Sequence, residues 1–215
     1  MQKYSKAVFY GDPEHQGLGV HNMYTTMVIY QLQALLDNIW KDNITGRLIR
    51  VSIESFKLDL GVTGPLFSEK YDVYGHMVTD CWVKHLWRFL FEHDIEVDED
   101  TMGGEALRDG DMMLGDIFAQ ACYQETITKR KWAAANRCRL YLQALSVADI
   151  ATGGGNTVDI SAKRGLPQKG RVRNVQWPYQ GKPGKLDWQV WRRVLKLTVY
   201  NAHQNCLHHR LGAYI

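Results

Sequence analysis

Apolar residues recur every three or four positions along much of the chain, which is the spacing of one face of an amphipathic helix. The first such stretch runs from Tyr24 to Ile39, after the turn-like Gly17-Leu18-Gly19. A second helix is expected to begin at Asn43 or Thr45, because either side chain can cap a helix. Gly61 is expected to end it. The buried stripe of this second helix is predicted to be Ile49, Ile53, Phe56 and Leu60.

The same periodicity continues in the rest of the chain. Four further helices are predicted: from Thr79, from Glu105 to about Cys122, from Trp132 to Leu145, and from about Asp187. Thr157 to Ile160 is predicted to form a short strand, and residues 161–185 a loop rich in Gly, Pro, Lys and Arg. We therefore expect a mainly α fold, a helical bundle with a basic, loop-rich C-terminal segment and little strand.

The two halves of the chain carry opposite charge. Residues 1–120 hold 10 Lys and Arg against 19 Asp and Glu, a net charge of −9, whereas residues 121–215 hold 16 against 4, a net charge of +12. A separation of this size indicates that the second half binds a polyanion. The alternative is that the two halves attract each other inside one fold.

Basic and aromatic residues are interleaved between Lys163 and Lys196, where Asp187 is the only acid. Guanidinium and ammonium groups neutralise phosphates, and aromatic faces stack on unpaired bases, so this segment favours nucleic-acid binding. The alternative is that Trp188 and Trp191 are core residues and the basic residues are simply solvated. The predicted nucleic-acid-binding residues are Arg137, Arg139, Lys163, Arg164, Lys169, Arg171, Arg173, Trp177, Tyr179, Lys182, Lys185, Arg192, Arg193 and Lys196.

No catalytic centre is predicted. Two-metal polymerase chemistry needs two carboxylates held close together, but Asp109 and Asp111 flank Gly110 at the start of an expected helix, and Asp98-Glu99-Asp100 lies in a solvated acidic run. The Gly153-Gly154-Gly155 cluster lacks the Gly-Lys-Ser/Thr of a phosphate-binding loop. Both kinds of candidate are better explained as solvated acids and turns.

No metal site and no cofactor are predicted either. His203, Cys206, His208 and His209 are residue types that bind zinc, and His203 and Cys206 are spaced as one helical turn. However, only one cysteine is available there, and the two adjacent histidines point in different directions on a regular element. The four cysteines of the chain show no paired spacing, and its apolar runs are too short to cross a bilayer. We therefore expect an intracellular protein, nuclear or cytoplasmic, with no membrane partner.

The N-terminal stretch Ala7–Pro13, followed by Gln16–Val20, resembles the segment after the polymerase domain of non-LTR-type reverse transcriptases, where a glycine-rich turn leads into the thumb helices. Gln16 stands in place of the first glycine of that turn. Further stretches resemble, in order, the C-terminal extensions of reverse-transcriptase-like retroelement proteins of diatoms and related algae. They are Leu32–Leu36, Thr45–Arg50, Lys57–Gly61, Asn136–Gln143, Ala148–Ile150, and Trp177–Gln180 with Pro183, Trp188 and Trp191.

This resemblance implies a thumb-like helical region at residues 1–100 and a basic helical extension at residues 101–215, or one continuous domain. It implies a non-catalytic segment of a retrotransposon-type protein that grips a template–primer duplex or RNA, with an upstream polymerase domain as a candidate partner. Fused to such a domain, the chain would be part of an RNA-directed DNA polymerase, but alone it is not expected to be an enzyme. Two other functions stay open: a protein-interaction module whose basic half docks on an acidic partner, and a metal-dependent nuclease that uses Asp109, Asp111 or the His203–His209 cluster.

Overall fold

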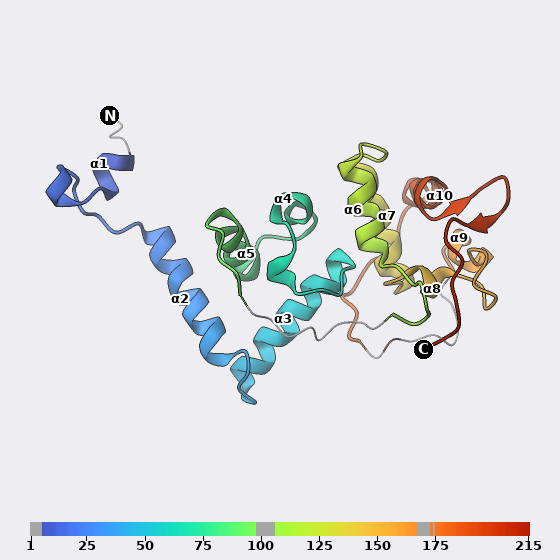
Figure 1. Ribbon diagram of the computed structural model, residues 1–215, viewed down its shortest axis with the longest axis horizontal. Coiled ribbons are helices and arrows are strands. Elements are labelled where there is room, and N and C mark those ends of the chain that lie inside the picture. The colour runs from blue at the N-terminus through green and yellow to red at the C-terminus, as the bar shows by residue number, and fades with distance from the viewer. Residues whose placement is uncertain (1–5, 98–105, 167–172, 174) are drawn as a thin grey trace.

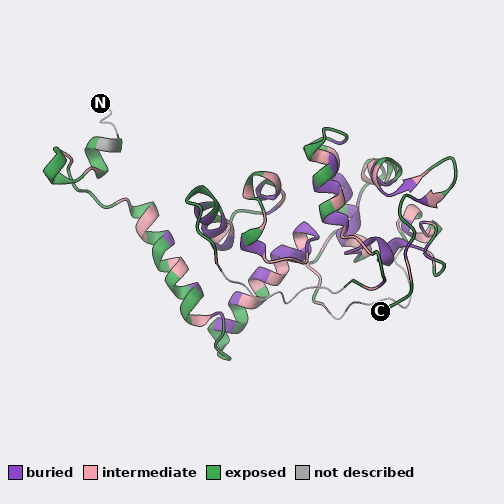
Figure 2. Cartoon of the chain, viewed as in Figure 1, coloured by how far each residue is buried: buried purple, intermediate pink, exposed green. Residues whose placement is uncertain are grey.

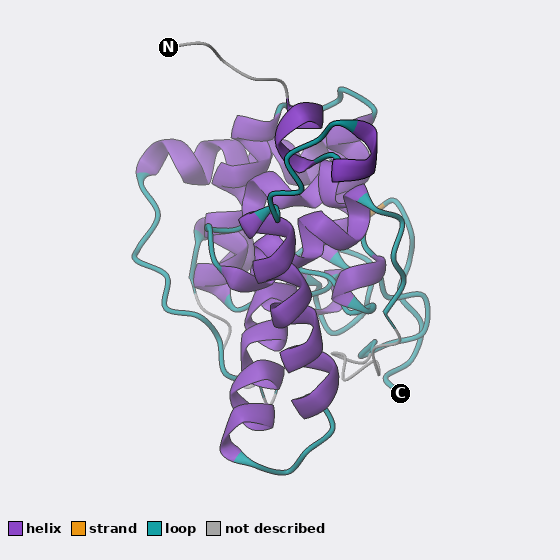
Figure 3. Cartoon of the chain, turned by 90° about the vertical axis from the view of Figure 1, so that its left-hand side faces the viewer, coloured by secondary structure: helices purple, strands orange, loops and turns teal. Residues whose placement is uncertain are grey.

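The computed structural model describes residues 6–97, 106–166, 173 and 175–215 (Figure 1). The described part of the chain is mainly α-helical, as the sequence predicts (Figure 3). It also contains one two-stranded antiparallel sheet. No helix in this part is both long enough and apolar enough to span a bilayer. The α-helices are α1 (Lys6–Tyr10), α2 (Met23–Asn38), α3 (Ile44–Leu60), α4 (Tyr71–Tyr74), α5 (Trp82–Glu92), α6 (Leu114–Tyr123), α7 (Lys129–Leu142), α8 (Val147–Ile150), α9 (Ile160–Arg164) and α10 (Lys185–Thr198), and the strands are β1 (Tyr200–Asn201) and β2 (Cys206–Leu207).

Local signals account for the ends of the longer helices. Asn43 caps α3, because its side chain accepts a hydrogen bond from the backbone N–H of Gly46 at 2.7 Å. Gly61 ends the same helix in the left-handed region, at φ 78°. The Thr128 side chain accepts a hydrogen bond from Lys131 N and caps α7. Gln143 ends α7 in the left-handed region, at φ 54°. The predicted helices at Tyr24–Ile39, at Asn43–Leu60 and near Asp187 are therefore confirmed to within a few residues.

A single cluster of buried side chains runs from Val28 to Leu211, so the N-terminal and C-terminal regions share a core. Burial is concentrated between α3 and α10, whereas α1 and much of α2 are exposed (Figure 2). In Figure 1, α2 projects from the rest of the molecule and carries α1 at its far end. Helix α2 contributes Val28 and Leu35 to the core, and its C-cap residue Ile39 continues this stripe.

The beginning of α6 packs backbone to backbone against the end of α3. The N–H of Gly115 donates to the carbonyl oxygen of Gly61 at 3.2 Å. A Cβ atom at position 115 would collide with the carbonyl oxygens of Leu60 and Gly61. This close approach joins the N-terminal helices to the C-terminal ones and requires a glycine on α6.

Gly115→Ala is expected to lower the free energy of unfolding by about 1–3 kcal/mol, because the added methyl forces two packed helices apart. Urea unfolding followed by circular dichroism measures this loss. Gly153→Ala is the matched control, because a Cβ there would meet nothing within 4 Å. If both substitutions change stability equally, the contact between α3 and α6 is not as close as described.

Several expected boundaries were wrong. The third helix begins at Trp82 and not at Thr79, and α6 begins at Leu114 and not near Glu105, a residue that itself lies outside the described part. The strand expected at Thr157–Ile160 is reduced to an isolated bridge between Ala151 and Val158. Ile160 instead begins α9, a helix within the expected loop, because Asp159 accepts a hydrogen bond from Ser161 N at 2.6 Å and caps it.

Candidate nucleic-acid interface

Helices α7 and α10 pack together and form the base of the candidate interface. Arg137 on α7 donates to Asp187 on α10 at 2.6 Å, and the rings of Tyr141 and Trp188 meet edge to face with centroids 5.9 Å apart. The hydrogen bond from Arg137 lowers the pKa of the Asp187 carboxyl. Trp191 is fully buried against Phe118, so it is a core residue, as the alternative for this segment expected.

One face of α10 is basic and exposed. Lys185, Arg192 and Lys196 are separated by seven and four residues, which places them on the same side of the helix, and Arg193 is their neighbour around the axis. Their side chains are exposed, whereas Val194 and Leu195 on the other side are buried in the core. We call Lys185, Arg192, Arg193 and Lys196 the α10 basic face.

Lys163 on α9 adds a further cation beside this face. Its Nζ lies 4.3 Å from the centroid of the Tyr200 ring and donates to Asn205 Oδ1 at 3.1 Å. Partial burial, and then the nearby charge of Lys196, lower the pKa of the Lys163 ammonium. Among the residues that the structure describes, no carboxylate forms an ion pair with Lys163 or Lys196.

Three of the four acids of the second half have structural roles that keep them from neutralising the α10 basic face. Asp149 pairs with Arg173, and Asp159 caps α9. Asp187 pairs with Arg137 and also accepts from the N–H of Gly184 at 3.1 Å, at the start of α10. Each ion pair between described residues joins partners in the same half of the chain, so none links the acidic half to the basic half.

The predicted nucleic-acid role of Arg139 is wrong. Its guanidinium is fully buried and donates to Asn136 Oδ1 at 2.7 Å, to the carbonyl oxygens of Leu58 and Asp59 at the end of α3, and to Ala144 O at 3.2 Å. Burial lowers the pKa of this guanidinium to about 10. A side chain that fastens α7 to α3 in this way cannot reach a phosphate at the surface.

The predicted role of Arg173 is wrong for the same reason. Its side chain is only 7% exposed, and its Nε lies 3.0 Å from Asp149 Oδ2. Its Nη2 donates to Ser146 Oγ at 2.8 Å. The guanidinium therefore ties the loop before α10 to the start of α8, where Asp149 also accepts from Ser146 N.

The other predicted residues are placed as follows. Arg137, Arg164 and Lys182 are exposed, Trp177 is half-buried, and Tyr179 is 97% exposed. Lys169 and Arg171 lie outside the described residues. Sequence reasoning left Lys129 and Arg130 out of the interface, although both are exposed at the start of α7, and the run Lys129-Arg130-Lys131 was the signal that could have included them.

The structure gives structural positions to Asp111, His203 and Cys206, three candidates for metal or catalytic chemistry. Asp111 accepts hydrogen bonds from the backbone N–H groups of Leu107, Met112 and Ala148, which is a structural role. His203 and Cys206 lie in the turn and second strand of the β1–β2 hairpin, so the expected helical spacing is wrong. Within the described ranges, no three His, Cys, Asp or Glu side chains gather where they could hold a metal ion.

Comparison of the chain with protein-family models, curated proteins and solved structures found no match.

Proposed function

We propose that this chain is a nucleic-acid-binding segment that contacts phosphates through the α10 basic face, with Lys163 and Arg137 beside it. The binding itself requires no catalytic group, and the resemblance to the region that follows a reverse-transcriptase core is consistent with this role. The observation that carries the proposal is the row of exposed cations on α10, which no carboxylate among the described residues neutralises.

The dimensions of the α10 basic face suit a phosphate backbone. At a rise of about 1.5 Å per residue, Lys185 and Lys196 lie roughly 16 Å apart along the helix. One strand of a duplex carries a phosphate about every 3.4 Å along its axis, so this length matches about five phosphates. Several cations on one face therefore have phosphates within reach at the same time, and each contact releases condensed counterions.

Tyr179 supplies a group that distinguishes unpaired from paired bases. Its ring is 97% exposed in the loop before α10, and an aromatic face in that position stacks on an unpaired base. A duplex hides its base faces, so stacking on Tyr179 would favour single strands. The proposal therefore includes single-stranded segments as well as duplexes as ligands.

Tyr179→Ala is expected to weaken binding to single strands by about 1 kcal/mol, roughly five- to tenfold, and to leave duplex binding nearly unchanged. Tyr179→Phe retains the ring and is expected to bind as the natural chain does. Because the side chain is almost fully exposed, neither substitution should change the melting temperature. An equal loss for duplex and single strand would count against stacking.

Fluorescence anisotropy with four labelled probes of the same length tests the function directly: single-stranded RNA, single-stranded DNA, duplex DNA and an RNA–DNA hybrid. We expect binding to at least one probe at low ionic strength. Polyglutamate of matched charge serves as the competitor that represents an acidic protein. Binding of polyglutamate together with no binding of any probe would contradict the proposal and favour docking on an acidic partner.

A further inference from the structure

Arg108 is a buried cation that no carboxylate of the described residues pairs with. Its side chain lies before α6 and the residue is 5% exposed. Nε donates to Gly212 O at 2.8 Å, Nη1 donates to Gly153 O at 3.1 Å, and the guanidinium carbon lies 4.5 Å from the centroid of the Tyr214 ring. Among the described residues, no carboxylate forms an ion pair with Arg108. Carbonyl dipoles and an aromatic ring solvate this charge but do not neutralise it, and a buried unpaired charge is costly.

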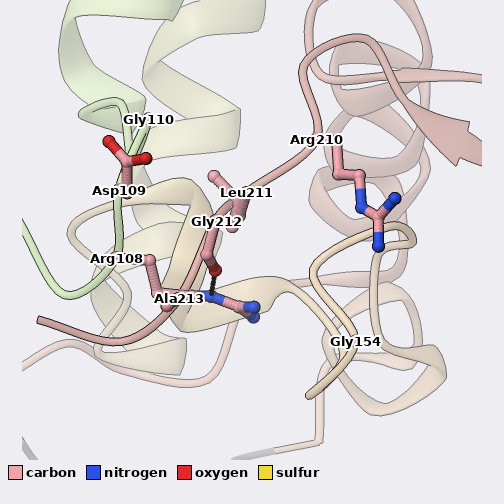
Figure 4. A pocket seen from close by; sticks show the side chains of 8 residues that line it. All are labelled: Arg108, Asp109, Gly110, Gly154, Arg210, Leu211, Gly212 and Ala213. Atoms are coloured by element: carbon pink, nitrogen blue, oxygen red, sulfur yellow. Dashed lines mark hydrogen bonds between the residues drawn. The ribbon is translucent and has the colours of Figure 1, made fainter.

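A pocket of about 510 Å³ opens beside Arg108 and is lined by a second arginine, Arg210 (Figure 4). Both guanidinium groups extend toward the turn that contains Gly154, whereas the carboxylate of Asp109 points away from them. The Nη2 atom of Arg108 donates to no residue in the described part of the chain. The pocket is therefore lined by two arginines, and one guanidinium nitrogen of Arg108 has no hydrogen-bond partner among the described residues.

The turn that contains Gly154, which Arg108 contacts through Gly153 O, adds a backbone donor. Gly155 N donates to Thr152 O at 2.9 Å and closes the turn, whereas the N–H of Gly154 makes no hydrogen bond to a described residue. A Cβ at position 154 would meet nothing within 4 Å, so there is open space beside this backbone. Backbone N–H groups of a tight turn next to arginines are a recurring environment for bound anions.

We propose that this pocket binds the phosphate group of a small phosphorylated ligand. Two guanidinium groups match the geometry and charge of a phosphate, which accepts several hydrogen bonds at once. The volume lies within the range of pockets that hold small ligands and leaves space beyond the phosphate itself. The pocket shares no residue with the α10 basic face, so the proposal does not depend on nucleic-acid binding.

Gly154→Asp is the sharpest test, because it adds a carboxylate to the pocket where the structure has room for it. Calorimetric titration with inorganic phosphate, adenosine monophosphate and adenosine at constant ionic strength is expected to show binding of the two phosphorylated compounds but not of adenosine. Gly154→Asp and Arg210→Ala are each expected to weaken this binding at least tenfold. Gly154→Ala and Gly181→Asp are the controls, since position 181 is equally open and lies outside the pocket.

Each outcome of this titration decides the proposal. Tighter binding of adenosine monophosphate than of phosphate identifies a nucleotide as the ligand, and equal binding identifies the free phosphate ion; both support the pocket. Equal responses to adenosine and its monophosphate, no response to any of the three, or full affinity in Gly154→Asp would overturn it. Charge reversal on α10 should leave this binding unchanged, so its failure is distinguishable from failure of the nucleic-acid proposal.

Discussion

Reversing three charges of the α10 basic face, as Arg192→Glu, Arg193→Glu and Lys196→Glu together, is expected to weaken nucleic-acid binding by on the order of a hundredfold at moderate salt. All three side chains are exposed, so the change removes phosphate contacts and introduces repulsion without disturbing the core. Anisotropy titration against the probe that the natural chain binds best measures the loss.

The control for this variant carries the same change of charge elsewhere. Lys41, Arg47 and Arg88 are exposed cations of the N-terminal region, outside the α10 basic face, and their replacement by glutamate also lowers the net charge by six. The control is expected to lose only a small part of the affinity, because contacts on α10 and not net charge determine binding. A loss as large as that of the α10 variant would contradict a localised interface.

Arg139→Ala is expected to lower the free energy of unfolding by about 3–5 kcal/mol, because it leaves several buried acceptors without a donor. The guanidinium donates to the carbonyl oxygens of Leu58, Asp59 and Ala144, and of these Asp59 O alone keeps another side-chain donor among the described residues, Asn136 Nδ2 at 2.7 Å. Denaturant unfolding of the purified protein measures the effect. Arg139→Lys should restore only part of the stability, since one ammonium group cannot reach all these acceptors.

Arg137→Ala is the comparison for this prediction. Arg137 lies two residues away on the same helix, but its pair with Asp187 is partly solvated, with side-chain exposures of 47% and 22%. Its loss is expected to cost about 1 kcal/mol or less. If Arg137→Ala and Arg139→Ala are equally destabilising, the buried network around Arg139 does not hold α7 against α3.

The contrast between these two arginines shows what the sequence could predict. Position 139 lies between Trp132 and Ala135 around the axis of α7, both of which belong to the buried stripe, so the helical period already placed Arg139 inside. We predicted a surface role from its charge instead. The carbonyl oxygens on α3 that make its burial tolerable, those of Leu58 and Asp59, lie about 80 residues earlier in the chain. No sequence pattern near residue 139 predicts these contacts.

Helix caps and apolar periodicity predicted the helix ends correctly where neighbouring residues determine them, as at Asn43 and Gly61. The predictions were wrong where contacts with residues far away in the sequence determine the local structure. Residues 106–113 looked like the start of a helix, but a bridge between Arg108 and Tyr214, a bridge between Met113 and Ser146, and the bond from Ala148 N to Asp111 hold them in a non-helical path with a turn at Asp109-Gly110. The pocket beside Arg108 was missed for the same reason, since its residues come from three separate segments of the chain.

Salt dependence tests nucleic-acid binding through the α10 basic face most directly. The measurement is the affinity of the natural chain and of the triple α10 variant for the same probe over a range of about 50 to 300 mM KCl. We predict that the logarithm of the association constant falls linearly with the logarithm of salt concentration. The slope should be smaller by roughly 3 in the variant, about one for each phosphate contact removed. Affinity that is absent at low salt, or that does not change with salt, would contradict this interface.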